Sequence, residues 1–141
     1  MNNKSIGVFD SGLGGLTAVK SLMRELPDEN IVYFGDTGRL PYGTKTEETI
    51  KKYAKGDINF LLSKDVKIII IACGTASSVA LDSLKDEYDI PIIGVVEAGA
   101  RASVLKTVNG KIGVLGTSAT INSNSYFNMI KKLLPTAEIY Q

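Results

Sequence analysis

The chain has 141 residues, of which 44% are hydrophobic and 22% charged, and its formal net charge is +1. These values are typical of one globular domain that buries its own apolar core without disulfides or metals. The balanced charge argues against a nucleic-acid partner, and no apolar run is long enough to span a membrane. Residues 1–4 lead directly into a strand-like segment and lack the apolar core of a signal peptide. We therefore expect a soluble, cytoplasmic protein.

Strand-like apolar runs alternate with segments of helical spacing along the whole chain. Strands are expected at 5–9, 31–34, 67–72, 92–96, 111–115 and 137–140. Helices are expected at 15–26, from about 46, at 77–88, at 98–107 and at 122–134. The run 67–72 is apolar on both faces, which is typical of a central strand in a parallel sheet. The pattern predicts an α/β fold with a parallel sheet flanked by helices.

Polar or reactive residues directly follow the expected strands. They are Asp10-Ser11, Asp36-Thr37, Cys73-Gly74-Thr75, Glu97 and Thr117-Ser118. Parallel strands place their carboxyl ends at one edge of a sheet, where open α/β sheets bind ligands. We therefore expect one constellation at that edge rather than a single motif.

Cys73 is the only cysteine, and the chain has no histidine. A Ser–His or Cys–His catalytic pair within one chain and an intrachain disulfide are therefore excluded, and a structural zinc site is not expected. A free cysteine is most often a buried core residue. A helix N-terminus, however, lowers the pKa of a thiol and exposes its sulfur. A cysteine phosphatase would need Arg in place of Val79, and a phosphoreceiver domain would need Asp and Lys in place of Cys73 and Thr117.

A thiolate can act as a base without histidine if hydrogen-bond donors stabilise the developing enolate. Candidate donors are Ser11, Thr75, Thr117 and the backbone amides around Gly43 and Gly74. Asp10 can hold a substrate ammonium or raise the basicity of the thiolate. The alternative for Asp10 is helix capping or loop hydrogen bonding.

Two glycine-rich segments, 10–15 and 38–45, resemble nucleotide-binding loops but fail at single positions. Thr17 stands where a dinucleotide fingerprint needs Gly, and Thr44 stands where a phosphate loop needs Lys. The glycines can serve turn sterics alone, or their amides can hold a carboxylate. Tyr42 can likewise serve turn packing alone. Arg39 is interpreted as a solvated surface group and Glu97 as the partner of a neighbouring cation, so both stay outside the site.

Five segments carry a resemblance to a known family. They are VFDSGLGGL at 8–16, GDTGRLPYG at 35–43, IACGTA at 71–76, PIIGVV at 91–96 and GVLGT at 113–117. In order and spacing they resemble the glutamate racemases of the aspartate/glutamate racemase family, from about Ile6 to the chain end. The resemblance implies interconversion of L- and D-glutamate without a cofactor or metal, for peptidoglycan synthesis and hence cell shape.

The resemblance also assigns roles to individual residues. In this family two cysteines flank the α-carbon, and Cys73 matches the first of them, with Asp10 as its catalytic companion. The matching substrate contacts are Asp10, Ser11, Tyr42, Gly43, Gly74, Thr75 and Thr117, and Thr120 is a weaker match.

Two departures from the family qualify this interpretation. The family usually has Asn where Gly74 stands, so an amide that touches substrate is missing. The family also has a second half that carries the second cysteine. We expect residues 1–97 to form the main part of a first domain and 98–141 to start a second one. The chain alone is then a weak or inactive racemase, and its exposed apolar surface favours a homo-oligomer. A non-catalytic module that binds a dicarboxylate or a partner, and a racemase for aspartate, stay open as alternatives.

Overall fold

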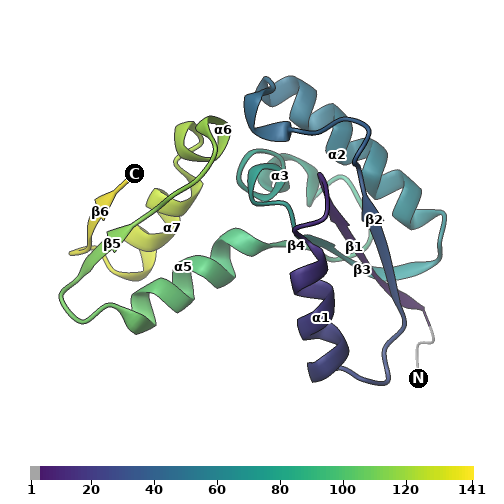
Figure 1. Cartoon of the computed structure of the whole chain (residues 1–141), viewed down its shortest axis with the longest axis horizontal. Helices are drawn as coiled ribbons and strands as arrows, with labels where there is room; N and C mark the ends of the chain where they lie inside the picture. The colour runs from purple at the N-terminus through teal and green to yellow at the C-terminus, as the bar shows by residue number, and fades with distance from the viewer. Residues whose placement is uncertain (1–3) are drawn as a thin grey trace.

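The computed structural model describes residues 4–141, which form a larger and a smaller unit (Figure 1). The expectation about the first three residues lies outside this range. The strands are β1 (Ser5–Asp10), β2 (Ile31–Gly35), β3 (Val66–Ile71), β4 (Ile92–Gly94), β5 (Lys111–Gly113) and β6 (Glu138–Tyr140). The helices are α1 (Leu16–Glu25), α2 (Glu47–Leu62), α3 (Gly74–Val79), α4 (Leu81–Leu84), α5 (Val95–Lys106), α6 (Ser118–Asn122) and α7 (Ser125–Leu133), with a 3₁₀ turn η1 at Tyr42–Thr44.

The larger unit, residues 4–94, contains a parallel sheet in the order β2-β1-β3-β4. In its register Val8 lies opposite Tyr33 on one side and Ile70 on the other, and Ile70 lies opposite Ile93. The smaller unit, residues 95–141, contains a separate parallel pair, β5 and β6. The predicted α/β class, a parallel sheet flanked by helices, is confirmed. The expectation of one common sheet edge is wrong for Thr117, because β5 does not belong to the larger sheet.

Helix α2 covers one face of the larger sheet. Its residues Ile50, Ala54, Ile58 and Leu61 recur at helical spacing and are all fully buried. Thr46 begins the helix, since its hydroxyl accepts a hydrogen bond from the Thr49 amide at 3.3 Å. This face holds the main apolar core, which makes α2 a fixed support for the loops beside it.

The opposite face of this sheet is only partly covered. Helix α1 approaches it at Gly15, where an added Cβ would meet Tyr33 at 3.2 Å. None of the described residues of α1 is buried, and Leu16 and Met23 are 46% and 63% exposed. Ile93 on β4, which faces the same side, is 47% exposed. The strand 67–72 was expected to be buried on both faces, and this face leaves it half-buried.

Two expected helices differ from the structure. The helix expected at 77–88 is divided into α3 and α4, and the helix expected at 122–134 is α7, preceded by the additional short helix α6. Side-chain caps explain the early starts, because Cys73 caps α3 and Thr117 caps α6. Asn124 separates α6 from α7 with a φ of 54°, a conformation that Asn tolerates better than most residues.

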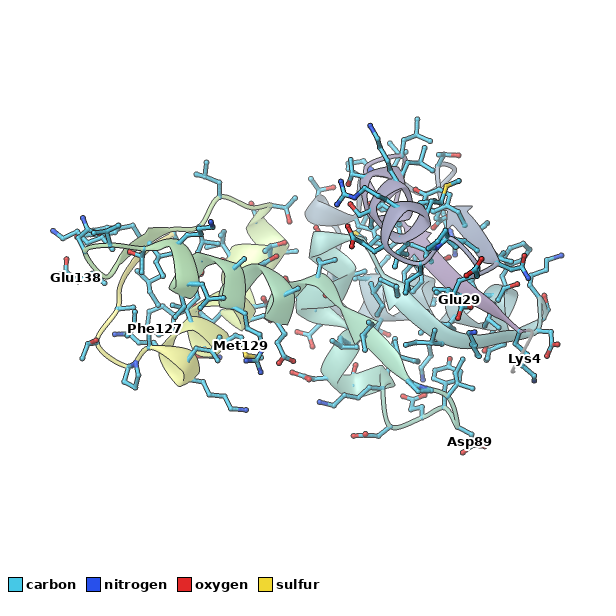
Figure 2. All side chains as sticks on the ribbon, turned by 90° about the horizontal axis from the view of Figure 1, so that it is seen from below. Lys4, Glu29, Asp89, Phe127, Met129 and Glu138 are labelled. Atoms are coloured by element: carbon cyan, nitrogen blue, oxygen red, sulfur yellow. The ribbon has the colours of Figure 1, made fainter. Side chains whose placement is uncertain are left out.

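The two units are joined through α5, which runs on from β4 and packs against α7. Figure 2 shows Phe127, Met129 and Glu138 on the smaller unit, well apart from Lys4, Glu29 and Asp89 on the larger one. The smaller unit has its own core, which includes Ala100, Ile112, Val114 and Ile130. Across residues 4–141, no helix is long and apolar enough to cross a membrane.

Candidate active site

A cleft of about 470 Å³ lies between the two units. On one side it is bounded by the residues after β1 and β3, and on the other by β5, α6 and the facing sides of α5 and α7. Six of the predicted site residues line it: Asp10, Ser11, Cys73, Gly74, Thr75 and Thr117. Thr120, the weaker match, lines it too.

Cys73 caps α3 at the floor of the cleft. Its sulfur accepts a hydrogen bond from the Ala76 amide at 3.4 Å and donates to the Ser11 hydroxyl at 3.4 Å. The residue is only 4% exposed, so the sulfur is less accessible than its place at a helix start suggests. The residue nevertheless lines the cleft.

Asp10 ends β1 and holds the loop that follows. Its Oδ2 accepts hydrogen bonds from the amides of Gly12 and Gly15, at 3.2 and 3.0 Å. Loop hydrogen bonding was the alternative to a catalytic role, and the two are compatible here because Asp10 also lines the cleft. Gly15 is required at this point, since an added Cβ would lie 2.7 Å from Asp10 Cβ.

Three threonine hydroxyls meet where the two units touch. Thr75 Oγ1 lies 2.9 Å from Thr117 Oγ1, which lies 3.0 Å from Thr120 Oγ1. Thr75 lies in the first turn of α3, whereas Thr117 and Thr120 belong to the start of α6. The three hydroxyls bond one another at one wall of the cleft, and each has one hydrogen that it can turn to a ligand instead.

Tyr42 and Gly43 lie behind this wall rather than in it. Neither lines the cleft, and the Tyr42 side chain is 1% exposed with its hydroxyl beside Asp36 and Asp57. Gly43 packs so closely on α6 that an added Cβ would lie 2.5 Å from Thr117 Cβ. The alternative for Tyr42, a turn residue that packs on the surface, is wrong, because its ring is part of the main core.

Three further polar residues lie away from the cleft. Asp36 points toward α2 and accepts from Arg39 Nε at 2.6 Å. Arg39 also bonds Asp57 at 2.7 Å, so its interpretation as a solvated surface group is wrong. Glu97 pairs with Arg101 on the surface of α5 at 2.7 Å, as expected.

Two tyrosines near the cleft were not predicted from the sequence. Tyr33 donates to the Gly12 carbonyl at 2.7 Å, and burial followed by the charges of Asp10 and Cys73 raises its pKa. Tyr126 lines the cleft from α7, and burial raises its pKa. Alternation along β2 places Tyr33 on the α1 face, but nothing in the pattern of α7 marks Tyr126. Within residues 4–141 no three His, Cys, Asp or Glu side chains gather as a metal site would need.

Comparison with known proteins identifies the family. The model of the family described as Asp/Glu/Hydantoin racemase matches residues 9–139. The chain belongs to this racemase family. It is 46% identical over 136 residues to a glutamate racemase of Geobacter metallireducens, which covers 96% of this chain and 50% of that relative. It is 48% identical over 139 residues to that of Streptococcus gordonii, covering 99% and 53%.

Solved racemase structures share its fold. A glutamate racemase isoform from Bacillus anthracis matches with a TM-score of 0.95 and 39% identity, covering 99% of this chain and 53% of that one. A Francisella tularensis glutamate racemase in complex with D-glutamate matches with a TM-score of 0.89 and 49% identity, covering 99% and 52%. The chain thus spans about half the length of the racemases it matches.

Proposed function

We propose that this chain binds glutamate in the cleft between its two units and that Cys73 moves the α-proton of the substrate. The observation that carries the proposal is that one thiol, bonded to the Ser11 hydroxyl, lines the same cleft as the threonine hydroxyls. The Francisella tularensis relative, crystallised with D-glutamate, supports glutamate as the ligand.

The reaction at Cys73 is a proton transfer that balances without a cofactor. The thiolate sulfur takes the α-hydrogen as a proton, and the electron pair of the C–H bond moves toward the substrate carboxylate as an enolate. Hydroxyls of Thr75 and Thr117 donate to the carboxylate oxygens, where charge develops. Asp10 holds the substrate ammonium near the end of β1. Return of the proton from the sulfur restores the thiolate.

Inversion of glutamate needs a base on one face of the α-carbon and an acid on the other. Cys73 is the only cysteine of the chain. By itself the chain is therefore expected to exchange the α-proton on one face with little racemisation. We propose that the chain divides into a first domain, 1–97, and the start of a second domain, 98–141, as expected from the sequence. The substrate would lie between these two parts. The boundary falls within α5, the element that links the two units.

Self-association is part of the proposal. Exposed apolar side chains lie on α1 and β4 over the partly covered face of the larger sheet. The pair β5–β6 also has unpaired edges, and two-stranded sheets are only marginally stable alone. A second copy of the chain, seated on the exposed face, would remove this apolar surface from water. Sedimentation at several concentrations tests this, and a clean monomer would contradict it.

The biological role of the chain is also a proposal. We propose that the activity supplies D-glutamate for peptidoglycan, and so for cell shape, in the cytoplasm. Expression of the chain in a bacterial strain that requires external D-glutamate tests this role. Because the chain alone is expected to racemise little, we expect weak or no growth without the supplement, and full growth that is lost on substitution of Cys73 would contradict the one-face expectation.

A non-catalytic binding module is the second candidate. It is favoured by the low exposure of Cys73 and by Gly74, which offers no side-chain amide to a ligand. Titration of the ¹⁵N-labelled protein with glutamate and aspartate separates the alternatives for binding. Shifts at cleft residues with glutamate alone support the proposal, and shifts with neither amino acid contradict it.

A further inference from the structure

A buried polar cluster lies next to the cleft but outside it. It joins Asp36, which follows β2, Arg39 and Tyr42 from the next loop, and Asp57 in the middle of α2. Asp57 is fully buried and Asp36 is 6% exposed. Charged side chains are rarely buried to this extent unless they are paired. The mutual pairing of these side chains is therefore what allows their burial.

The oxygen–oxygen distances in the cluster bear on how many of its acidic groups are protonated. Tyr42 Oη lies 2.5 Å from Asp36 Oδ2 and 2.8 Å from Asp57 Oδ2. A phenol has one hydrogen to donate, so it satisfies one carboxylate and must accept from the other group. Ionised carboxylates only accept, so with both acids ionised the two oxygens would have to share the single phenol hydrogen. A proton on one of the two acids turns both contacts into full hydrogen bonds.

The arginine contacts show which acid carries the proton. Asp36 Oδ2 already faces Arg39 Nε at 2.6 Å in addition to Tyr42, so this oxygen acts as an acceptor. The two oxygens of Asp57 have different partners. Oδ1 faces Arg39 Nη2 at 2.7 Å, and Oδ2 faces only the phenol. A proton on Asp57 Oδ2 can therefore be donated to Tyr42 Oη, whose own hydrogen goes to Asp36.

The cluster fixes the position of the loop that carries Gly43. Tyr42 is anchored at its hydroxyl, and the next residue, Gly43, is pressed against Thr117. Thr117 in turn bonds Thr75 across the two units.

A further titratable group lies beside Asp57, in addition to Asp36, Arg39 and Tyr42. The ring of Tyr53 on α2 lies beside the cluster, with its centre 4.6 Å from the Arg39 guanidinium carbon.

We propose that Asp57 is a positioning residue of the cleft: in its protonated form it donates a hydrogen bond to Tyr42 and thereby fixes Gly43 against the threonine wall. The effect of Asp57 on ligand binding rests on the proposed function, whereas the protonation of Asp57 does not. Burial, ahead of the charge of Asp36, raises the pKa of Asp57 from 3.8 to about 6, although the bonds from Tyr42 and Arg39 oppose this. Loss of the proton at higher pH removes one hydrogen bond from the anchor.

The test is a ¹³C NMR titration of the aspartate carboxyl groups, with ¹⁵N shifts of Gly43 and Thr117 recorded on the same samples. We expect one carboxyl to titrate near pH 6 and the two amide shifts to follow the same curve. In Asp57→Asn, whose amide can donate to Tyr42 and accept from Arg39, that carboxyl disappears and the two amide shifts become independent of pH in this range. Ile58→Val, the buried neighbour on α2, serves as the control that leaves the titration unchanged.

Ligand binding supplies an independent readout. Glutamate affinity is expected to fall with the same pH dependence in the wild type, to stay level in Asp57→Asn, and to drop about tenfold in Asp57→Ala, the loss of a hydrogen bond to a buried group. If Asp57 titrates near pH 4, or if Gly43 and Thr117 do not follow its titration, the proposal is overturned. If no variant binds glutamate but the shifts follow Asp57, the proposed function fails and the positioning role stands.

Discussion

At the scale of single residues, two glycines set the shape of the proposed site in opposite ways. Gly43 has no room for a side chain, because an added Cβ would lie 2.5 Å from Thr117 Cβ. Gly74 has open space, since nothing in the described part of the chain lies within 4 Å of an added Cβ. The first glycine is therefore required by packing, and the second leaves room for a larger side chain.

Gly43→Ala should separate the η1 turn from α6. We expect a loss of about 1–3 kcal/mol in the free energy of unfolding, as in other overpacked sites. We also expect weaker glutamate binding, because Thr117 is displaced. Thermal denaturation and ligand titration measure the two effects. Gly38→Ala in the same loop is the matched control, because an added Cβ there meets nothing within 4 Å in the described structure. Equal behaviour of the two variants would refute the packing argument.

Gly74→Asn should tighten glutamate binding. The new amide would point into open space at the cleft and add one hydrogen bond, worth about 1 kcal/mol or a roughly fivefold lower Kd. Gly74→Ala separates this effect from the change in backbone freedom, because it adds only the Cβ. An Asn variant that binds no better than the Ala variant would show that the cleft does not place the ligand beside residue 74.

At the scale of elements, α2 supports the loop beside the cleft through Asp57. An acid whose pKa is higher in the folded than in the unfolded state binds more protons when folded, so stability falls as pH rises. For Asp57 this fall should occur between its ordinary value of 3.8 and about 6, and level off above. The cost of ionisation is at most about 3 kcal/mol. Urea unfolding of wild type and Asp57→Asn across this range checks it, and parallel curves would contradict it.

Most elements could be predicted from hydrophobic periodicity. The buried face of α2 follows directly from its apolar spacing, and only Asp57 interrupts it. The starts of α3 and α6 and the break at Asn124 could not be foreseen, since they depend on local capping by Cys73 and Thr117 and on one left-handed residue.

The candidate site was predictable where residues directly follow strands. Asp10, Ser11, Cys73 and Thr75 meet at the cleft for this reason. The direction of a side chain could not be predicted. Asp36 also follows a strand, yet it faces α2 instead of the cleft. The role of Asp57 depends on its burial. The sequence does not show that burial, because a charged residue in a helix usually faces solvent.

At the scale of the whole molecule, the exposed apolar face is the feature most open to test. Ile93 and Met23 are 47% and 63% exposed on β4 and α1. Substitution by Lys at either position should weaken self-association by adding a charge to the interface. Leu105→Lys on α5, where the side chain is 83% exposed, is the control. Sedimentation that shows the same dissociation constant for all three variants would place the interface elsewhere.

The central claim is that Cys73 is a thiol base acting on glutamate in this cleft. The most direct measurement is proton NMR of L-glutamate incubated with the protein in D₂O, which follows loss of the α-proton and the chirality of the product together. We predict exchange with little inversion for the wild type and loss of exchange in Cys73→Ala. Equal exchange in both proteins, or none in the wild type with either glutamate or aspartate, would contradict the claim.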